Sequence, residues 1–165
     1  CSSDLKTLCL LRHAEALSGF DDRQRPLSPA GVVAAQNVGR FMQQRKISPD
    51  IALVSSSLRT SQTASLVLAP FPEVDVRLHD SLYNALADHA FDIVRACPVS
   101  AQNVLLVGHN PFIPDMAMIL SGPPECDRFL RYAPATLSVF SFSEGDWALL
   151  SPDSVRLIDV FPAQE

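Results

Sequence analysis

The sequence has no long apolar run and no cluster of positive charge, and each absence excludes a class of protein. No segment reaches the ~18 consecutive apolar residues that a membrane-spanning helix needs, and the first apolar run, residues 8–11, follows a polar start. Lysine and arginine are dispersed and total 13 against 18 acidic residues, which gives a net charge of -5. Nucleic-acid binders usually present a basic face. We therefore expect no membrane segment, no secretion signal, no nucleic-acid partner and a cytoplasmic location.

Cysteine is scarce as well. Its four copies stand at positions 1, 9, 97 and 126, and no two are close enough for a CxxC metal or redox motif. Cys9 and Cys97 lie in apolar segments, where a free thiol behaves as a small hydrophobic side chain. We expect both in the core of a reduced chain that needs no metal and no cofactor, with a disulfide as the open alternative.

What the sequence does contain is an alternation of short apolar runs with helical periodicity, over 165 residues of which 47% are hydrophobic. This length fits one domain, residues 1–165. Residues 7–11, 51–54 and 104–107 are apolar throughout, which is typical of strands buried on both faces, and residues 74–78 are a weaker candidate. Strands that alternate with helices predict a three-layer α/β/α fold around a mostly parallel sheet.

Four helices are expected between and after these strands. The first begins at the cap Ser28-Pro29, the second near Ser57, and the fourth opens at Asn110-Pro111. Helical spacing predicts their buried positions, which are, in chain order, Ala34, Val38, Phe41 and Met42; Thr60, Ala64, Val67 and Leu68; Leu86, Ala90, Ile93, Val94 and Cys97; and Phe112, Ile113, Met116, Ala117 and Leu120. Residues 136–142 and 147–150 flank a short polar turn and predict an antiparallel C-terminal hairpin, which makes the sheet mixed.

Arginine and histidine collect where the predicted strands end. Arg12 and His13 follow the first strand, Arg59 comes shortly after the second, and His109 follows residues 104–107. Ligands of open α/β sheets bind beyond the carboxyl ends of the strands, so these side chains should meet at one edge. Guanidinium forks match phosphate oxygens, and a neutral imidazole nitrogen can attack phosphorus. No carboxylate accompanies either histidine at metal-ligand spacing, so the sequence predicts a phosphate site and no metal.

Four sequence blocks resemble those of one family. LRHAE at residues 11–15 resembles the RHG/RHA signature of the histidine phosphatase (phosphoglycerate mutase-like) superfamily, and VSSSLRTSQTA at 54–64 resembles its SSPxxRxxQTA block. VGHNP at 107–111 resembles its third block, and DRQRPLSPAG at 22–31 resembles its D-x-x-R-P-L-[ST]-x-x-G segment. A single such motif is weak, but four in order are strong. The short chain is most similar to the SixA-type phosphohistidine phosphatases.

The resemblance implies both a fold and a set of roles. It implies a phosphoglycerate mutase-like fold in which His13 accepts the phosphoryl group, without a metal. By the same resemblance Arg12 and Arg59 hold the phosphoryl oxygens and His109 stabilises the transition state. Larger family members carry a carboxyl group that protonates the leaving group. Here Asp80 is the nearest candidate acid, with a loop-capping carboxylate as the alternative, and Glu15 and Asp21 are weaker candidates.

Arg25 is a candidate substrate contact, with a surface position before Pro26 as the alternative. Three functions follow from these residues. The first is a hydrolase that acts on protein phosphohistidine. The second is a general phosphomonoesterase that takes phosphoserine or small phosphate esters at the same site. The third is a phospho-ligand binding module with weak catalysis, which the complete Arg12, His13, Arg59 and His109 set argues against. The expected partner is thus a phosphorylated protein or a small phosphate ester.

Overall fold

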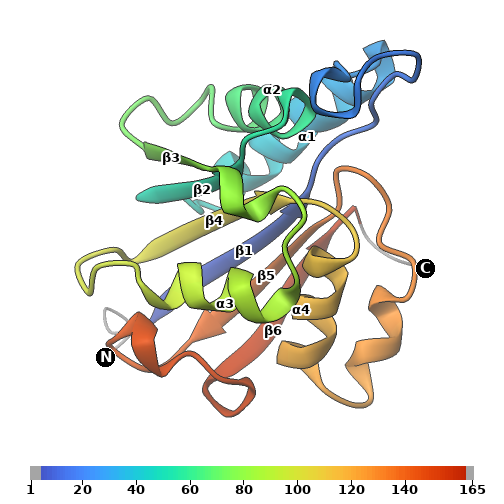
Figure 1. Ribbon diagram of the computed structural model, residues 1–165. Helices are drawn as coiled ribbons and strands as arrows, with labels where there is room; N and C mark the ends of the chain where they lie inside the picture. Colours follow the sequence, from blue (N-terminus) through green and yellow to red (C-terminus); the bar gives the residue numbers. More distant parts are fainter. Residues whose placement is uncertain (1–4, 163–165) are drawn as a thin grey trace.

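The computed structural model describes residues 5–162 and is built on a six-stranded mixed sheet (Figure 1). The strands are β1 (Lys6–Arg12), β2 (Ile51–Ser55), β3 (Asp75–His79), β4 (Asn103–Gly108), β5 (Leu137–Phe142) and β6 (Val155–Phe161), in the order β3-β2-β4-β1-β5-β6. β1 to β4 pair in parallel, and β5 and β6 add antiparallel pairing. The predicted mostly parallel mixed sheet is therefore confirmed.

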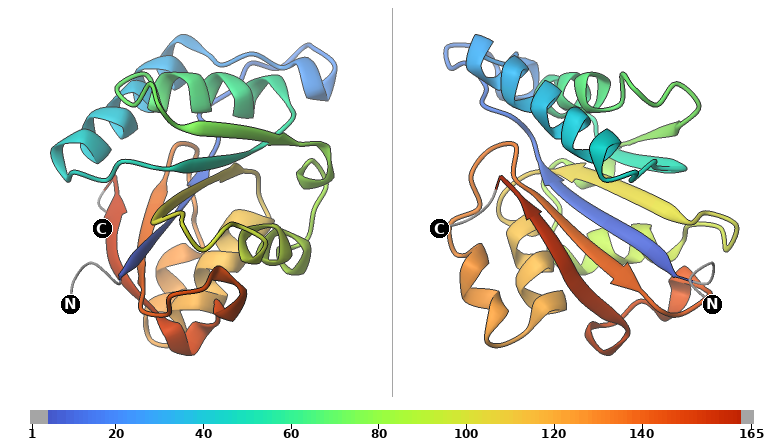
Figure 2. Two further views of the ribbon diagram at one scale, coloured as in Figure 1. Left: turned by 90° about the vertical axis from the view of Figure 1, so that its left-hand side faces the viewer. Right: turned by 180° about the vertical axis from the view of Figure 1, so that it is seen from behind.

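Two helices cover each face of the sheet (Figures 1 and 2). α1 (Pro29–Gln44) and α2 (Leu58–Val67) lie on one side, and α3 (Ala87–Arg95) and α4 (Phe112–Ser121) lie on the other. Successive residues of β1 serve opposite cores, because side chains alternate along a strand. Leu8 and Leu10 pack with α3 and α4, whereas Cys9 and Leu11 pack with α1 and α2. This two-sided burial explains why the central strands are apolar throughout.

The helix starts follow the predicted caps. The Ser28 hydroxyl accepts from the Gly31 N–H at 3.0 Å before Pro29, and the Ser57 hydroxyl accepts from the Thr60 N–H. In α1 the fully buried alanine is Ala35, with Ala34 only partly buried. All five residues predicted for the buried face of α4 are confirmed.

The predicted face of α3 is wrong at one position. Leu86 is 72% exposed, because the helix begins only at Ala87 and Leu86 has the extended backbone of a cap. Phe91 fills the apolar face together with Ala90 and Val94, and Cys97 is buried beyond the end of the helix.

The second arm of the C-terminal hairpin is also misplaced by the sequence analysis. Residues 147–150, predicted as a strand, instead form the short 3-10 turn Trp147–Leu149 with Leu150 at its C-cap, and the partner of β5 is β6. The indole of Trp147 is fully buried and donates to the Ala101 carbonyl at 2.8 Å, which holds this segment against the helical layer. The Asp146 carboxylate caps the turn by accepting from the Ala148 N–H at 3.0 Å. The predicted antiparallel C-terminal pair is confirmed, but its strands are β5 and β6, joined by the longer segment 143–154.

The cysteines behave as small apolar side chains. Cys9 and Cys97 are buried, and together with Cys126 they are free thiols, whereas Cys1 lies outside the described residues. Within residues 5–162, none of the helices is both long enough and apolar enough to cross a membrane.

Candidate active site

The carboxyl ends of β1, β2 and β4 bring the predicted arginines and histidines together. His13 is the first residue after β1, His109 is the first after β4, and Arg59 lies in the first turn of α2. The His13 and His109 rings lie 5.5 Å apart between centroids, tilted by 60°. Neighbouring parallel strands explain this approach, because Arg12 and Gly108 are register partners in β1 and β4. The predicted arginine and histidine side chains therefore lie together at one edge of the sheet, as the sequence analysis expected.

The ring of His13 is held with one nitrogen left to react. Its Nδ1 lies 2.7 Å from the Ala14 carbonyl oxygen, and a carbonyl can only accept, so Nδ1 carries the hydrogen. Nε2 therefore keeps its lone pair. Burial, together with the charges of Arg12 and Arg59 and against the opposing hydrogen bond to Ala14, lowers the pKa of His13 to about 4. At neutral pH His13 is an uncharged imidazole, the form that can act as a nucleophile.

His109 is neutral for the same reason. Burial, followed by the charge of Arg59, lowers its pKa to about 3. Its Nε2 lies 2.7 Å from the hydroxyl of Ser55, the last residue of β2. Gly108 precedes it because the Phe112 ring packs directly on the strand backbone there, where any Cβ would clash.

Arg12 and Arg59 each keep an unsatisfied donor. Arg12 Nη1 donates to the Tyr132 carbonyl at 2.9 Å, and Arg59 donates from both terminal nitrogens to Asp22. Nε of both arginines and Nδ1 of His109 are shielded from solvent and have no hydrogen-bond partner among the described residues. Burial, and then repulsion from Arg59, lowers the pKa of Arg12. Two guanidiniums with free donors form a site that an anion would complete, since buried polar groups are normally paired.

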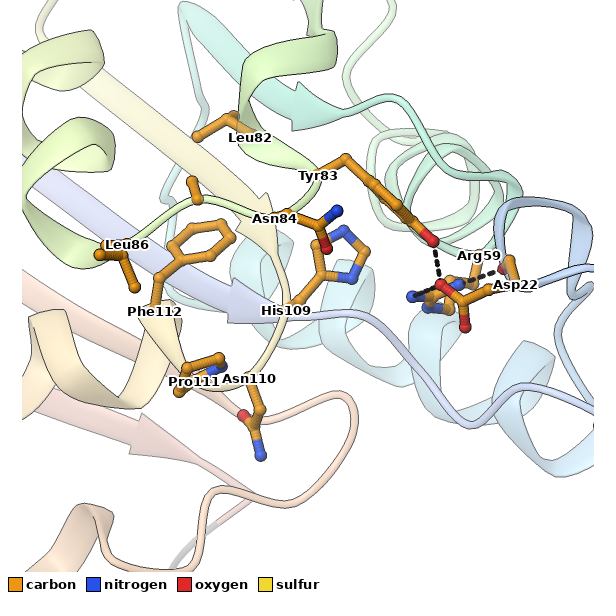
Figure 3. Close-up of a pocket in the computed structure, with 11 residues that line it drawn as sticks. Asp22, Arg59, Leu82, Tyr83, Asn84, Leu86, His109, Asn110, Pro111 and Phe112 are labelled. Atoms are coloured by element: carbon orange, nitrogen blue, oxygen red, sulfur yellow. Dashed lines mark hydrogen bonds and ion pairs between the residues drawn. The ribbon is translucent and has the colours of Figure 1, made fainter.

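Asp22 joins this group although the sequence analysis did not single it out. Its carboxylate Oδ2 accepts from the Tyr83 hydroxyl and from Arg59 Nη2 (Figure 3). The Arg23 guanidinium carbon lies 4.0 Å from the centroid of the Tyr83 ring. A pocket of about 190 Å³ opens beside them. It is lined by Asp22, Arg59, Leu82, Tyr83, Asn84, Ala85, Leu86, His109, Asn110, Pro111 and Phe112. Beyond Arg59 and His109, the sequence analysis gave these residues no role in the site, although Asp22, Asn110 and Pro111 belong to the quoted blocks at 22–31 and 107–111.

Comparison with known proteins decides the family. The model of the histidine phosphatase superfamily (branch 1) matches residues 8–89. A candidate phosphohistidine phosphatase SixA from Nakamurella multipartitia has the same fold, with a TM-score of 0.86 and 33% identity over 94% of this chain and 95% of that chain. The chain belongs to the histidine phosphatase superfamily.

Two further relatives are similar to this chain over most of its length. A candidate SixA from Agrobacterium tumefaciens matches with a TM-score of 0.82 and 26% identity, over 96% of this chain and 98% of that chain. An uncharacterized protein from Mycobacterium tuberculosis (strain H37Rv) is 24% identical over 156 residues, which are 90% of this chain and 96% of the relative. This histidine phosphatase is thus SixA-like, and it is a phosphatase.

The structure brings none of the three predicted acids into the pocket of this histidine phosphatase. Asp80 is exposed at the start of the 3-10 turn Asp80–Leu82 and is not among the residues that line the pocket. The Glu15 carboxylate accepts from the Ser28 hydroxyl at 3.0 Å, and Asp21 is exposed. Asp22 does line the pocket, but the hydrogen bond from Tyr83, with that from Arg59 and against the opposing effect of burial, lowers its pKa. It is therefore ionised at neutral pH and accepts hydrogen bonds.

Arg25 was predicted either to contact substrate or to lie on the surface before Pro26, and its side chain makes contacts within its own loop. Its Nε donates to the Leu17 carbonyl at 2.9 Å, and Nη1 lies 3.5 Å from Asp22 Oδ1. It thus stabilises the loop that carries Asp22. Its charge also acts on His13, after burial and the charges of Arg12 and Arg59, by lowering the pKa of that ring. Arg25 is part of the electrostatic surroundings of the site, at its outer edge.

Proposed function

We propose that this histidine phosphatase hydrolyses phosphohistidine on proteins, by transferring the phosphoryl group to His13 Nε2 and then to water, without a metal. The observation that carries the proposal is the position of the neutral His13. Its Nδ1–H is fixed on the Ala14 carbonyl, and its ring lies 5.5 Å from that of His109. The same site holds buried donors of Arg12 and Arg59 for which residues 5–162 provide no hydrogen-bond partner.

In the first step the lone pair of His13 Nε2 forms a bond to phosphorus. The bond between phosphorus and the substrate imidazole breaks, and that ring, which carries a hydrogen on its other nitrogen, takes the electron pair and leaves as neutral imidazole. The three phosphoryl oxygens carry the charge during transfer, and Arg12 and Arg59 are the groups that offset it. The phosphorylated His13 ring still holds a hydrogen on Nδ1, and the Ala14 carbonyl stabilises this cationic ring by accepting from it.

In the second step water attacks phosphorus on His13. The oxygen of the water bonds to phosphorus, the bond from phosphorus to Nε2 breaks, and the product leaves as dihydrogen phosphate with both hydrogens of the water. His13 keeps its hydrogen on Nδ1 and regains the lone pair on Nε2. Arg12 and Arg59 hold the same oxygens in both steps, which is why one site can serve both.

The absence of a protonated carboxyl group among the residues that line the pocket supports a phosphoramidate substrate. An alkoxide is a poor leaving group and needs a proton during departure, whereas an imidazole leaves more easily. Asp22, the carboxylate in the pocket, is held ionised by Tyr83 and Arg59, so it is poorly suited to donate a proton. Phosphohistidine is the protein phosphoramidate that fits such a site.

Turnover of a substrate panel tests the proposal. The panel contains a phosphohistidine peptide, a phosphoserine peptide, a sugar phosphate and p-nitrophenyl phosphate, all at one pH and ionic strength. The expected order of kcat/KM has the phosphohistidine peptide and the aryl ester far above the two alkyl esters. A preference for phosphoserine or the sugar phosphate would favour a general phosphomonoesterase. Binding of the panel without turnover of any member would favour a phospho-ligand module.

A further inference from the structure

Ser55 lies at the carboxyl end of β2 and contacts the second histidine of the site. Its side chain is fully buried, and its hydroxyl oxygen lies 2.7 Å from His109 Nε2. No other hydrogen bond of this hydroxyl is present among the described residues. The backbone carbonyl of Ser55 is bound separately, by the Thr60 hydroxyl at 2.6 Å, which fixes the end of the strand. The position of the hydroxyl is therefore set by the fold.

Two arrangements of hydrogens are compatible with a serine hydroxyl and an imidazole at this distance. If His109 Nε2 carried the hydrogen, the Ser55 hydroxyl hydrogen would be left without an acceptor and His109 Nδ1 without a donor. If Ser55 donates to Nε2, the hydroxyl hydrogen and Nε2 are both paired, and the N–H at Nδ1 is the one group left unpaired. A buried donor or acceptor without a partner is destabilising, so the arrangement with fewer unpaired groups is favoured.

The surroundings of His109 leave no competing partner for its ring. The centroid of the Tyr83 ring lies 5.7 Å from that of the His109 ring, and the centroid of the Phe112 ring lies 6.3 Å from it, both in edge-on arrangements. His109 Nδ1 is shielded from solvent and has no hydrogen-bond partner among the described residues. Within hydrogen-bonding distance of the ring, Ser55 is the polar side chain that can decide which nitrogen holds the hydrogen.

We propose that Ser55 is a positioning residue that donates its hydroxyl hydrogen to His109 Nε2, so that His109 carries its own hydrogen on Nδ1 and offers it to a phosphoryl oxygen. The use of that N–H on phosphate rests on the proposed function, whereas the tautomer of His109 does not. The two histidines of the site then have the same Nδ1–H tautomer, but a different nitrogen of each ring faces the substrate. His13 directs Nδ1–H at the protein and reacts through Nε2, and His109 accepts from the protein at Nε2 and donates from Nδ1.

Imidazole NMR measures the tautomer directly. Long-range ¹H–¹⁵N correlation on protein labelled with ¹⁵N-histidine distinguishes protonated from unprotonated ring nitrogens, and the chain has only four histidines. Spectra of His79→Gln, His89→Gln and His109→Gln assign the signals. In the wild type at pH 7 the His109 pattern should be that of the Nδ1–H tautomer. In Ser55→Ala it should change to a mixture or to Nε2–H, while Ser55→Thr, which keeps the hydroxyl, should restore it.

The same variants are assayed for turnover of the phosphohistidine peptide. Ser55→Ala should lower kcat by about 10–100-fold with a smaller change in KM, as for other partners that orient a functional histidine. Ser154→Ala is the matched control, because Ser154 is another buried serine and its hydroxyl bonds only within the Ser151 turn. This control should keep both the tautomer and the wild-type kcat.

Two results would overturn the assignment of Ser55. One is a wild-type His109 with its hydrogen on Nε2, and the other is an Nδ1–H tautomer that persists unchanged in Ser55→Ala. The failure of the proposed function has a different signature. Wild-type protein that shows the expected tautomer and its loss in Ser55→Ala, but no turnover of any phosphate substrate, would refute the phosphatase proposal and support the role of Ser55 in setting the tautomer.

Discussion

Asp22 holds Arg59 at two points, with its backbone oxygen 2.5 Å from Nη1 and its carboxylate oxygen 3.2 Å from Nη2. These two contacts occupy the terminal nitrogens of the guanidinium (Figure 3), and Nε has no hydrogen-bond partner in the described part of the chain. Tyr83 donates to the same carboxylate oxygen, so a loop before α1 and a turn after β3 together orient an arginine of α2. The orientation of Arg59 is thus decided by segments distant from it in sequence.

Asp22→Ala should weaken the inhibition of turnover by inorganic phosphate by about tenfold, because a hydrogen bond to a charged group contributes about 1.5–3 kcal/mol and part of that is lost with the acceptor. Asp22→Asn should stay close to the wild type, since its amide oxygen still accepts from Arg59 and the exposed carboxylate charge is screened by water. Asp21→Ala, at the neighbouring exposed position, is the control. Tighter phosphate binding in Asp22→Ala would mean that charge repulsion outweighs the orientation of Arg59.

Stability should fall as the pH falls from 6.5 toward 4. His13 and His109 have pKa values of about 4 and about 3 in the folded protein, below the usual value near 6.5 in an unfolded chain. Between these values the unfolded state binds more protons than the folded state, so the free energy of unfolding decreases with decreasing pH. The loss should be on the order of 2 kcal/mol for each histidine by pH 5.

Urea unfolding at pH 7.5 and pH 5 measures this difference. His109→Gln should remove about half of the decrease, whereas His89→Gln, at an exposed position, should leave it unchanged. Equal stability of the wild type at the two pH values would show that the two rings are not held neutral by burial.

His13→Ala should abolish turnover and leave the fold intact, because the ring lies at a strand end and its removal leaves both apolar cores unchanged. Brief incubation with a labelled phosphohistidine peptide, followed by denaturation at alkaline pH, should trap label on the wild type and none on His13→Ala. Arg59→Ala should weaken phosphate binding as well as turnover. A His13→Ala protein with near wild-type rates would place the nucleophile elsewhere.

Asp80→Asn should change kcat/KM by no more than about twofold on any substrate of the panel, as expected for an exposed substitution outside the pocket. A general acid in that position would instead cost on the order of 10²–10⁴-fold on alkyl esters. Kinetics of Asp80→Asn on the phosphohistidine peptide and on a sugar phosphate separate these outcomes.

Turnover should survive incubation with EDTA, because Arg12 and Arg59 supply the positive charge that a metal ion would otherwise bring to the phosphoryl oxygens. The measurement is the rate on p-nitrophenyl phosphate before and after treatment and dialysis. Loss of activity that zinc or magnesium restores would contradict the metal-independent mechanism.

Much of the active site could be predicted from short segments. Arg12 and His13 directly follow β1 and His109 directly follows β4, and parallel strands bring their carboxyl ends to the same edge of a sheet. The serine caps before α1 and α2 were equally local, since a hydroxyl and an N–H three residues later decide them. The central strands could also be predicted from short segments, because a strand that is buried on both faces is apolar at every position.

By itself the sequence determined the family, the strands β1 to β4 and the four arginine and histidine side chains, because each depends on neighbours along the chain. Only the tertiary structure decided which carboxylate meets Arg59, which nitrogen of each histidine holds a hydrogen, and where the partner of β5 begins. Asp22 and Tyr83 are 61 residues apart and meet through two loops. Leu86 is exposed where the sequence predicted burial, and the buried Trp147 lies in a 3-10 turn where the sequence predicted a strand, because helix ends and the packing of a large indole depend on the surrounding layers. Contacts of this kind depend on the conformations of loops and on the packing between layers, and the periodicity of apolar residues along the chain does not predict either.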